Sequence, residues 1–264
     1  MSRSLQTEVP LLGGIANQGL VFRVGDTVRR PLRSTSAATH ALLRHLAAVG
    51  FDGAPRFLGV DAHGREVLSY IPGEAIIRPY PSWALTDEAI TSVAVLLRRY
   101  HQAVSTFDAA PHAWPPSPPT SFRDGIVSHN DPNLDNVVFR DREPVALIDF
   151  DLASPGSRLW DVAAAARFWA PLRADRDIKD ARRGRALRRF RLFVDAYGLV
   201  GTDRKLMVDA VIHNHDWLYE IVRQGAEHGH PGFGPYWWGD AADRSSRTRR
   251  WYLRNEQLLR TALD

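Results

Sequence analysis

The chain of 264 residues lacks cysteine altogether and has only two lysines, Lys179 and Lys205. The absence of cysteine excludes disulfide bonds, catalysis by a thiolate and zinc sites built on cysteine. The chain also lacks a run of about 18 apolar residues, so we expect no membrane-spanning helix. Its first ten residues contain no apolar stretch like that of a signal peptide, which favours a cytoplasmic protein.

The excess of positive charge is small, because 34 basic residues stand against 30 acidic ones for a net charge of +4. Binding to nucleic acid depends on clustered positive charge. We therefore expect no nucleic-acid partner, since the sequence has no basic module interleaved with aromatic residues. Hydrophobic residues make up 44% and charged residues 24%, which is typical of a folded globular protein.

The first 71 residues have the pattern of a small strand-rich lobe. Residues 20–24 and 27–29 are rich in strand formers and flank the turn Gly25-Asp26, which predicts a β-hairpin. Residues 37–49 have a helical spacing of apolar side chains. Residues 66–71 form another predicted strand, which ends at the Pro-Gly pair that follows.

The remainder of the chain is mainly helical in pattern. Thr86 is a suitable N-cap for a helix that keeps a 3.6-residue apolar period to about Val104. The proline-rich segment 111–119 predicts a loop. Beyond residue 160 we expect further helices, interrupted near residues 198–201 and by a loop at 229–239. The sequence thus predicts an α+β fold with a small β-rich lobe followed by a larger helical one.

The segment from His129 to Asp151 carries the chemistry. Residues 137–139 and 145–148 are apolar runs separated by a polar turn, so they should pair as an antiparallel hairpin. This pairing brings Asn136 and Asp149 together at one end of the hairpin, at a cross-strand distance of about 5 Å. Asp131 lies on the loop that enters the same end.

Phosphoryl transfer from a nucleotide needs this set of oxygen-bearing side chains. Mg²⁺ takes oxygen ligands, usually one or two carboxylates completed by phosphate and water, and Asn136 and Asp149 suit that task. A further carboxylate must orient the acceptor hydroxyl and receive its proton, and Asp131 suits that role. The second carboxylate after the hairpin, Asp151, is open to two interpretations: it contacts a second metal ion or only a loop amide.

The spacing His129-x-Asp131 with Asn136 five residues on, followed by Ile148-Asp149-Phe150-Asp151, resembles the paired motifs of the aminoglycoside phosphotransferase and choline kinase-like family. The resemblance implies a two-lobed protein-kinase-like fold, with residues 1–71 as the nucleotide-binding lobe and residues 72–264 as the catalytic and acceptor-binding lobe. It implies transfer of the γ-phosphate of ATP or GTP to a hydroxyl of a small molecule, such as an aminoglycoside-like antibiotic, a sugar or an amino alcohol.

The same resemblance assigns roles to individual residues. It implies that Asp131 is the catalytic base, that Asn136 and Asp149 bind Mg²⁺, and that His129 supports the loop. It implies that Asp161 starts a helix and ties the catalytic loop in place. The backbone at Ser69 and Ile71 resembles the hinge that holds the nucleotide base.

The small lobe departs from the family pattern, because no lysine precedes Lys179. Arg29 is the best substitute by position for the missing phosphate-binding lysine, with Arg30 next, since a guanidinium binds phosphate through two hydrogen bonds. No Asp or Glu lies between residues 27 and 51, so the usual glutamate partner cannot come from the predicted helix, which has His40 near that place. In the glycine-rich loop before the hairpin, Asn17 is a candidate cap for the phosphates or a turn residue.

The missing lysine–glutamate pair leaves a second interpretation open, a non-catalytic nucleotide- or ligand-binding pseudokinase module. Within the enzyme interpretation, a polycationic antibiotic as acceptor needs an acidic pocket. The large lobe has candidate acids for such a pocket at Asp216, Glu220, Glu227, Asp240 and Asp243, although it is rich in arginine. The acceptor, the choice between ATP and GTP and the oligomeric state are left undetermined by the sequence.

Overall fold

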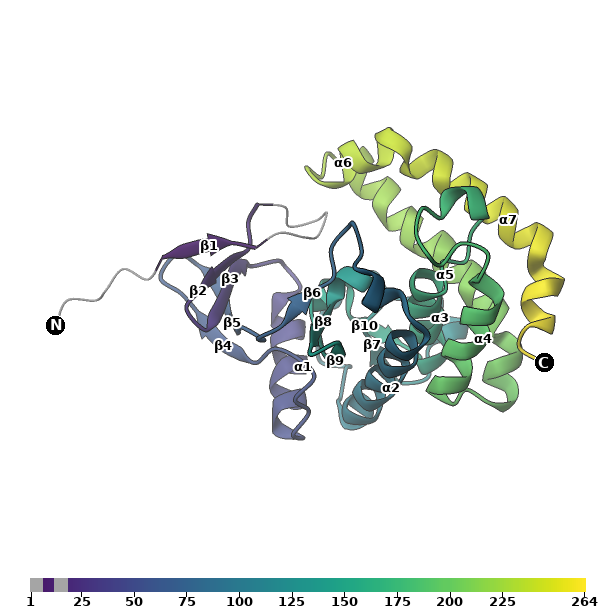
Figure 1. Ribbon diagram of the computed structural model, residues 1–264. Helices are drawn as coiled ribbons and strands as arrows, with labels where there is room; N and C mark the ends of the chain where they lie inside the picture. The colour runs from purple at the N-terminus through teal and green to yellow at the C-terminus, as the bar shows by residue number, and fades with distance from the viewer. Residues whose placement is uncertain (1–6, 12–18) are drawn as a thin grey trace.

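A computed structural model describes residues 7–11 and 19–264 of the chain. Figure 1 shows a small lobe built around a β-sheet and a larger, mainly helical lobe beside it, as the sequence pattern predicts. Within the described residues, no helix combines the length and the apolar character needed to cross a membrane. The predicted boundary after Ile71 stays a prediction.

The small lobe is a five-stranded antiparallel sheet with one helix. The strands, in the order β1-β2-β3-β5-β4, are β1 (Glu8–Pro10), β2 (Phe22–Val24), β3 (Thr27–Pro31), β5 (Arg65–Ser69) and β4 (Phe57–Val60). The predicted hairpin at Gly25-Asp26 is confirmed as β2 and β3. Helix α1 (Ser36–Ala48) buries the leucines of its inner face, which explains the helical spacing of the sequence.

Two small sheets lie where the lobes meet. One is formed by β6 (Glu74–Ala75), β8 (Val137–Arg140) and β9 (Glu143–Leu147), and the other by β7 (Ile126–Ser128) and β10 (Ser154–Gly156). The predicted hairpin at residues 137–148 is thus confirmed as β8 and β9. Its turn is tighter than predicted, because Asp141 and Arg142 both take positive φ angles and join Arg140 directly to Glu143.

The large lobe is a stack of helices: α2 (Asp87–Ala103), α3 (Arg158–Trp169), α4 (Ala186–Tyr197), α5 (Gly201–Glu227), α6 (Phe233–Tyr236) and α7 (Ala242–Thr261). Thr86 caps α2 as predicted, because its hydroxyl accepts a hydrogen bond from the N–H of Ala89 at 3.2 Å. Helix α3 is buried along almost its whole length and packs against α4 and α5. Its run of alanines lets these helices approach closely.

One predicted loop is wrong. Residues 229–239 were expected to be irregular, yet α6 lies within this segment and a π-helical turn (Trp237–Ala241) joins it to α7. Gly234 and Pro235 lie within α6, and Gly239 lies within the π-helical turn, so these residues do not interrupt the helical backbone here. Figure 1 shows α6 and α7 running along the outer side of α5.

Candidate active site

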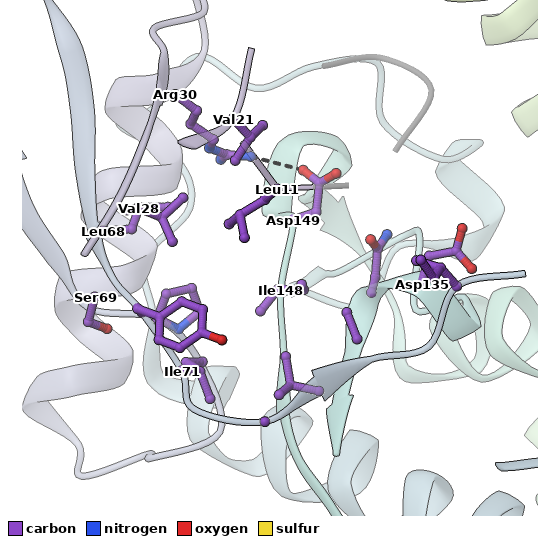
Figure 2. Close-up of a pocket in the computed structure, with 17 residues that line it drawn as sticks. Leu11, Val21, Val28, Arg30, Leu68, Ser69, Ile71, Asp135, Ile148 and Asp149 are labelled. Carbon is purple, nitrogen blue, oxygen red and sulfur yellow. Dashed lines mark hydrogen bonds and ion pairs between the residues drawn. The ribbon is translucent and has the colours of Figure 1, made fainter. Parts of the chain in front are cut away.

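A cavity of about 320 Å³ lies between the lobes. Figure 2 shows Ser69 and Ile71 toward one end of it and Arg30 and Asp149 toward the other. The side chains of Val28 on β3, Leu68 on β5 and Ile148, which directly follows β9, give it apolar walls. The cavity therefore has an apolar part and a charged end, a combination that is common in small-molecule binding sites.

The candidate catalytic loop, residues 129–136 between β7 and β8, holds Asp131 in a fixed orientation. Its Oδ1 accepts a hydrogen bond from Nδ2 of Asn133 at 2.9 Å, and its Oδ2 accepts one from Nδ2 of Asn136 at 3.0 Å. The same Nδ2 of Asn136 also donates to the carbonyl of Asp131 at 2.9 Å. The amide of Asn136 therefore turns its nitrogen toward Asp131, which leaves Oδ1 on the opposite side of the amide.

Asp161 anchors this loop from α3, as the sequence predicted, although the helix begins three residues earlier, after the N-cap Ser157. Its side chain is fully buried and accepts hydrogen bonds from the backbone N–H groups of His129 at 2.7 Å and Asn130 at 2.8 Å. Asn130 has a φ angle of 67°, an uncommon conformation outside glycine. The two bonds from Asp161 stabilise that conformation and so set the direction in which Asp131 leaves the loop.

His129 is structural. Its ring is fully buried, its Nε2 lies 3.0 Å from the carbonyl of Ile148, and it packs against Phe150 with a ring separation of 4.5 Å. Burial lowers its pKa below the ordinary value, so the ring is neutral and donates its Nε2 proton to that carbonyl. It thus joins the catalytic loop to the strand end that carries Asp149.

Asp149 is placed by an unusual backbone conformation. Its φ angle is 62° and its ψ angle 68°, a left-handed geometry that costs an ordinary residue energy and is common at functional sites. Its carboxylate pairs with Nη1 of Arg30 at 3.0 Å. Burial, and then the negative charge of Asp151, raise the pKa of Asp149 to about 6, whereas Arg30 opposes the rise. Asp151 itself pairs with Nη2 of Arg30 and with Nε of Arg33, both at 2.8 Å.

Arg30 also has a partner within the small lobe. Its Nε donates to Oε1 of Glu66 at 2.5 Å, and the other oxygen of Glu66 lies 2.7 Å from Nε2 of His40 on α1. The register of the sheet causes this contact, because Arg30 on β3 stands directly opposite Glu66 on β5. The site thus has a buried cation with an acidic partner, but the acid comes from a strand and is held by a histidine of the helix.

Arg29 lies elsewhere. Consecutive side chains of a strand point to opposite faces, and Arg29 pairs with Asp61 at 3.6 Å instead of lining the cavity. Position along the chain alone favours Arg29 over Arg30 as the phosphate-binding cation. The alternation of side chains along β3 indicates Arg30 instead. Val28 lines the cavity, and Arg30, two residues further on, lies on the same face of the strand.

The two predicted hinge residues differ in their backbone hydrogen bonds. The N–H of Ser69 donates to the carbonyl of Arg56 at 2.8 Å. Within the described part of the chain, neither the N–H nor the carbonyl of Ile71 has a backbone partner. Both residues line the cavity. Asn17, the predicted phosphate cap, lies outside the described residues.

The environment of Asp131 perturbs its carboxyl group. Burial, and then the negative charge of Asp149, raise the pKa of Asp131 to about 8, while the hydrogen bond from Asn133 and the positive charge of Arg167 oppose the rise. Once it has lost its proton, a carboxylate in such an environment is a stronger base than an ordinary aspartate. The structure thus brings together the three residues that the sequence singled out, namely Asp131, Asn136 and Asp149.

The residues at the charged end of the cavity fit a magnesium ion by their chemistry. Asn136 supplies an amide oxygen that is turned away from Asp131, Asp149 supplies a carboxylate, and both line the same cavity. Oxygen ligands of this kind, few in number and completed by phosphate and water, are what Mg²⁺ takes. In the described residues there is no cluster of three or more His, Asp or Glu suited to bind a metal entirely by protein side chains.

Comparison with known proteins places this site in a family. The profile described as "APH: Phosphotransferase enzyme family" matches residues 103–193, which include the catalytic loop, Asp149 and Asp161. A trifolitoxin immunity protein of Rhizobium leguminosarum bv. trifolii is 31% identical over 269 residues, an alignment that covers 98% of this chain and 100% of that protein. The chain belongs to the phosphotransferase enzyme family. It is accordingly a small-molecule phosphotransferase, as the sequence predicted.

Solved structures agree with this family at the level of the fold. The GDP complex of an aminoglycoside 2'-phosphotransferase-IIIa has a TM-score of 0.63 and 15% identity, over 96% of this chain and 94% of that one. A microcompartment-associated aminopropanol kinase has a TM-score of 0.62 and 14% identity, over 98% and 94% of the two chains. A choline/ethanolamine kinase family protein from Mesorhizobium loti has a TM-score of 0.58 and 19% identity, over 98% and 92%. This phosphotransferase therefore has the predicted kinase-like fold.

Proposed function

We propose that this phosphotransferase moves the γ-phosphate of ATP or GTP to a hydroxyl of a small molecule, with Asp131 as the base. The observation that supports it most is the arrangement of Asn136, whose amide holds Asp131 while the residue lines the cavity beside Asp149. A binding module without catalysis has no use for a carboxylate held in this way. Solved relatives in complex with GDP, or with ADP and streptomycin, support a nucleotide and a small molecule as the two substrates.

The proposed roles follow from the positions of the side chains. The hydroxyl of the acceptor donates a hydrogen bond to Asp131, which takes its proton as the new oxygen–phosphorus bond forms. The bond between the γ-phosphorus and the bridging oxygen breaks, and its electron pair leaves with the nucleoside diphosphate. When bound by Asn136 and Asp149, Mg²⁺ would neutralise negative charge on the phosphates.

Nucleotide binding is assigned to the small lobe and the hinge. Ile71 offers a backbone N–H and carbonyl to the base, with Ser69 lining the same wall of the cavity. Arg30 takes the place of the phosphate-binding lysine, in preference to Arg29, because it lines the cavity and contacts Asp149. A guanidinium offers two parallel donors to phosphate oxygens. A cytoplasmic location stays part of the proposal.

Two variants test the proposal. Asp149→Ala should abolish the thermal stabilisation that Mg²⁺ with ATP or GTP gives to the wild type. Asp131→Asn should keep that stabilisation and lose acceptor phosphorylation in a mass-shift assay of hydroxyl compounds. Asp141→Asn, in the exposed β8–β9 turn, is the matched control and should behave as wild type. A wild type without any response to Mg-nucleotide would favour the pseudokinase interpretation.

The relative with 31% identity raises a second candidate function, protection against a toxin. In that role the acceptor hydroxyl would belong to the toxin or to a molecule that the toxin resembles. Survival of toxin-sensitive cells that express the wild type, lost with Asp131→Asn, would identify phosphorylation as the means of protection. Survival retained by Asp131→Asn would instead identify sequestration by binding.

A further inference from the structure

Glu66 holds the guanidinium of Arg30 from the side of β5. Each of the three guanidinium nitrogens contacts a different carboxylate: Nε contacts Glu66 at 2.5 Å, Nη1 contacts Asp149 at 3.0 Å (Figure 2) and Nη2 contacts Asp151 at 2.8 Å. The group is planar and rigid, so a turn that breaks one of these contacts disturbs the others. The carboxylate at Nε therefore helps to decide where Nη1 and Nη2 lie at the charged end of the cavity.

Glu66 is itself held on its other side by His40. Glu66 is 2% exposed, and its second oxygen lies 2.7 Å from Nε2 of His40 on α1. An ionised carboxylate only accepts hydrogen bonds, so Nε2 carries a proton and donates it to Glu66. A buried carboxylate needs partners for its oxygens. His40 thus supplies one of the two side-chain contacts that keep Glu66 in place.

The ring of His40 has a fixed orientation. His40 is 7% exposed and stacks on the ring of Phe57 of β4, with 3.7 Å between the ring centroids and 19° between the planes. The guanidinium of Arg44, one turn later on α1, lies 4.6 Å from the centre of the same Phe57 ring. Both contacts favour one arrangement of the rings. The Nε2 atom of His40 therefore stays directed at Glu66.

His45 shows how a second histidine of the same helix is used. Its Nε2 lies 3.1 Å from the backbone carbonyl of Ala103 at the end of α2, so it joins α1 to the large lobe. The contact of His40, in contrast, continues through Glu66 to Arg30 and from there to Asp149. The two histidines therefore separate the packing of α1 from a connection to the candidate metal ligand.

We propose that His40 is a positioning residue for the nucleotide: through Glu66 it sets the guanidinium of Arg30 where the phosphates bind. The inference rests on the proposed function and deepens it by adding a residue that acts through another. Nη1 and Nη2 of Arg30 carry two N–H groups each, so each nitrogen can donate to a phosphate oxygen and keep its carboxylate. Without His40, we expect Glu66 to turn its second oxygen to Arg30 as well, because arginine–carboxylate pairs favour two parallel hydrogen bonds. The guanidinium then moves toward β5 and away from the phosphates.

The first experiment measures nucleotide binding, which needs no knowledge of the acceptor. Calorimetry with Mg-ADP and Mg-GDP, well below the thermal midpoint of each variant, gives dissociation constants without turnover. For the nucleotide that the wild type binds, His40→Leu should raise the dissociation constant roughly tenfold, equivalent to about 1.4 kcal/mol. His40→Gln should restore it to within about twofold, because the glutamine amide places an N–H near the position of Nε2. The matched control His45→Leu also loses a hydrogen bond of α1 and should bind as the wild type does.

The second experiment asks whether His40 acts through Glu66. The same dissociation constant is compared among His40→Leu, Glu66→Gln and the double variant. The two substitutions break one connection, so the double variant should bind roughly tenfold more weakly than the wild type, like either single variant. A loss of about a hundredfold in the double variant would mean two independent effects and would overturn the inference.

A purely structural His40 predicts a different pattern. His40→Leu would then lower the thermal midpoint but keep wild-type binding, and that result would end the proposal. Should the leucine variant fail to fold, His40→Asn replaces it, because its shorter amide corresponds to Nδ1 and stops short of Glu66. Roughly tenfold weaker binding is again expected, and wild-type affinity in this variant would count against the inference.

The wild type separates this inference from the proposed function. If it binds Mg-ADP or Mg-GDP and the leucine and asparagine variants of His40 bind equally well, only the role of His40 is refuted. If it binds neither nucleotide, the proposed function is refuted and the role of His40 with it.

Discussion

Replacing Glu66 by glutamine tests how Arg30 is held. Glu66 is 2% exposed, and its two oxygens contact Arg30 at 2.5 Å and His40 at 2.7 Å. Hydrogen bonds to charged groups contribute about 1.5–3 kcal/mol each. Glutamine keeps the shape and one acceptor but loses the charge, and Arg30 keeps Asp149 and Asp151. We therefore expect the free energy of unfolding to fall by about 2–3 kcal/mol.

The assay combines thermal unfolding with nucleotide kinetics. A loss of this size should lower the thermal midpoint by roughly 5–10 °C in a chain of this length. Arg30 should also lose its fixed position, so the KM for the nucleotide should rise roughly tenfold, which corresponds to about 1.4 kcal/mol. The control Glu220→Gln removes an exposed acid from a salt bridge with Arg223 and should cost less than about 0.5 kcal/mol. Equal midpoints and equal KM values for the Glu66 and Glu220 variants would refute the reasoning.

Three further predictions concern the loop, the hinge and pH. Asp161→Asn should lower the free energy of unfolding by about 3 kcal/mol, because it removes the buried negative charge that accepts the hydrogen bonds of the loop. A urea midpoint equal to that of the wild type would argue against Asp161 as the anchor of the loop. Gly73→Ala should cost about 1–3 kcal/mol and raise the nucleotide KM, because its Cβ would lie within van der Waals overlap of the Phe139 carbonyl at a φ of +149°. Gly64→Ala is the control, because Gly64 has a φ of +73° but open space around the added Cβ. Equal losses of stability in the two variants would contradict a steric clash at Gly73. Finally, the raised pKa of Asp131, about 8, favours the protonated carboxyl in the folded state. Between the ordinary pKa of aspartate and this value the folded state binds more protons than the unfolded state, so the thermal midpoint of the ligand-free protein should fall as pH rises from about 5 to 8. Asp131→Asn should flatten the curve, whereas parallel curves for the two proteins would show that another group titrates.

The convergence of Asp131, Asn136 and Asp149 could be predicted from the sequence because the segments that carry them are close in the chain. Asn136 and Asp149 are brought together by one hairpin whose turn and apolar runs are visible in the sequence, and Asp131 lies five residues before Asn136. Asp161 was found only by family resemblance, since no local pattern indicates that a helix side chain binds the backbone of a loop 31 residues earlier. The hairpin can be predicted without knowing how the helices pack, whereas the role of Asp161 depends on how α3 packs against the loop.

The cation of the small lobe could not be predicted in the same way. Its acidic partner, Glu66, is 36 residues from Arg30 and is selected by the register between β3 and β5. A shift of this register by one residue would place Glu66 opposite another residue. Helix α1 has no Asp or Glu, so the acid that pairs with Arg30 comes from β5 instead. Similarly, residues 229–239 form helical turns because their aromatic residues pack beside α5 and α7, a tertiary effect that overrides glycine and proline signals.

The contacts of Asp161 have a consequence for how activity is lost. This carboxylate also lies 3.0 Å from Nε2 of His101 on α2, whose Nδ1 lies 2.7 Å from the hydroxyl of Tyr197 on α4. The loop that carries Asp131 is thus connected through the buried side chain of Asp161 to α2, α3 and α4. We therefore expect the loop to unfold together with these helices and not in a separate transition at lower temperature. On heating, catalytic competence and helical content should vanish together, so the active fraction of a sample serves as a measure of its folded fraction.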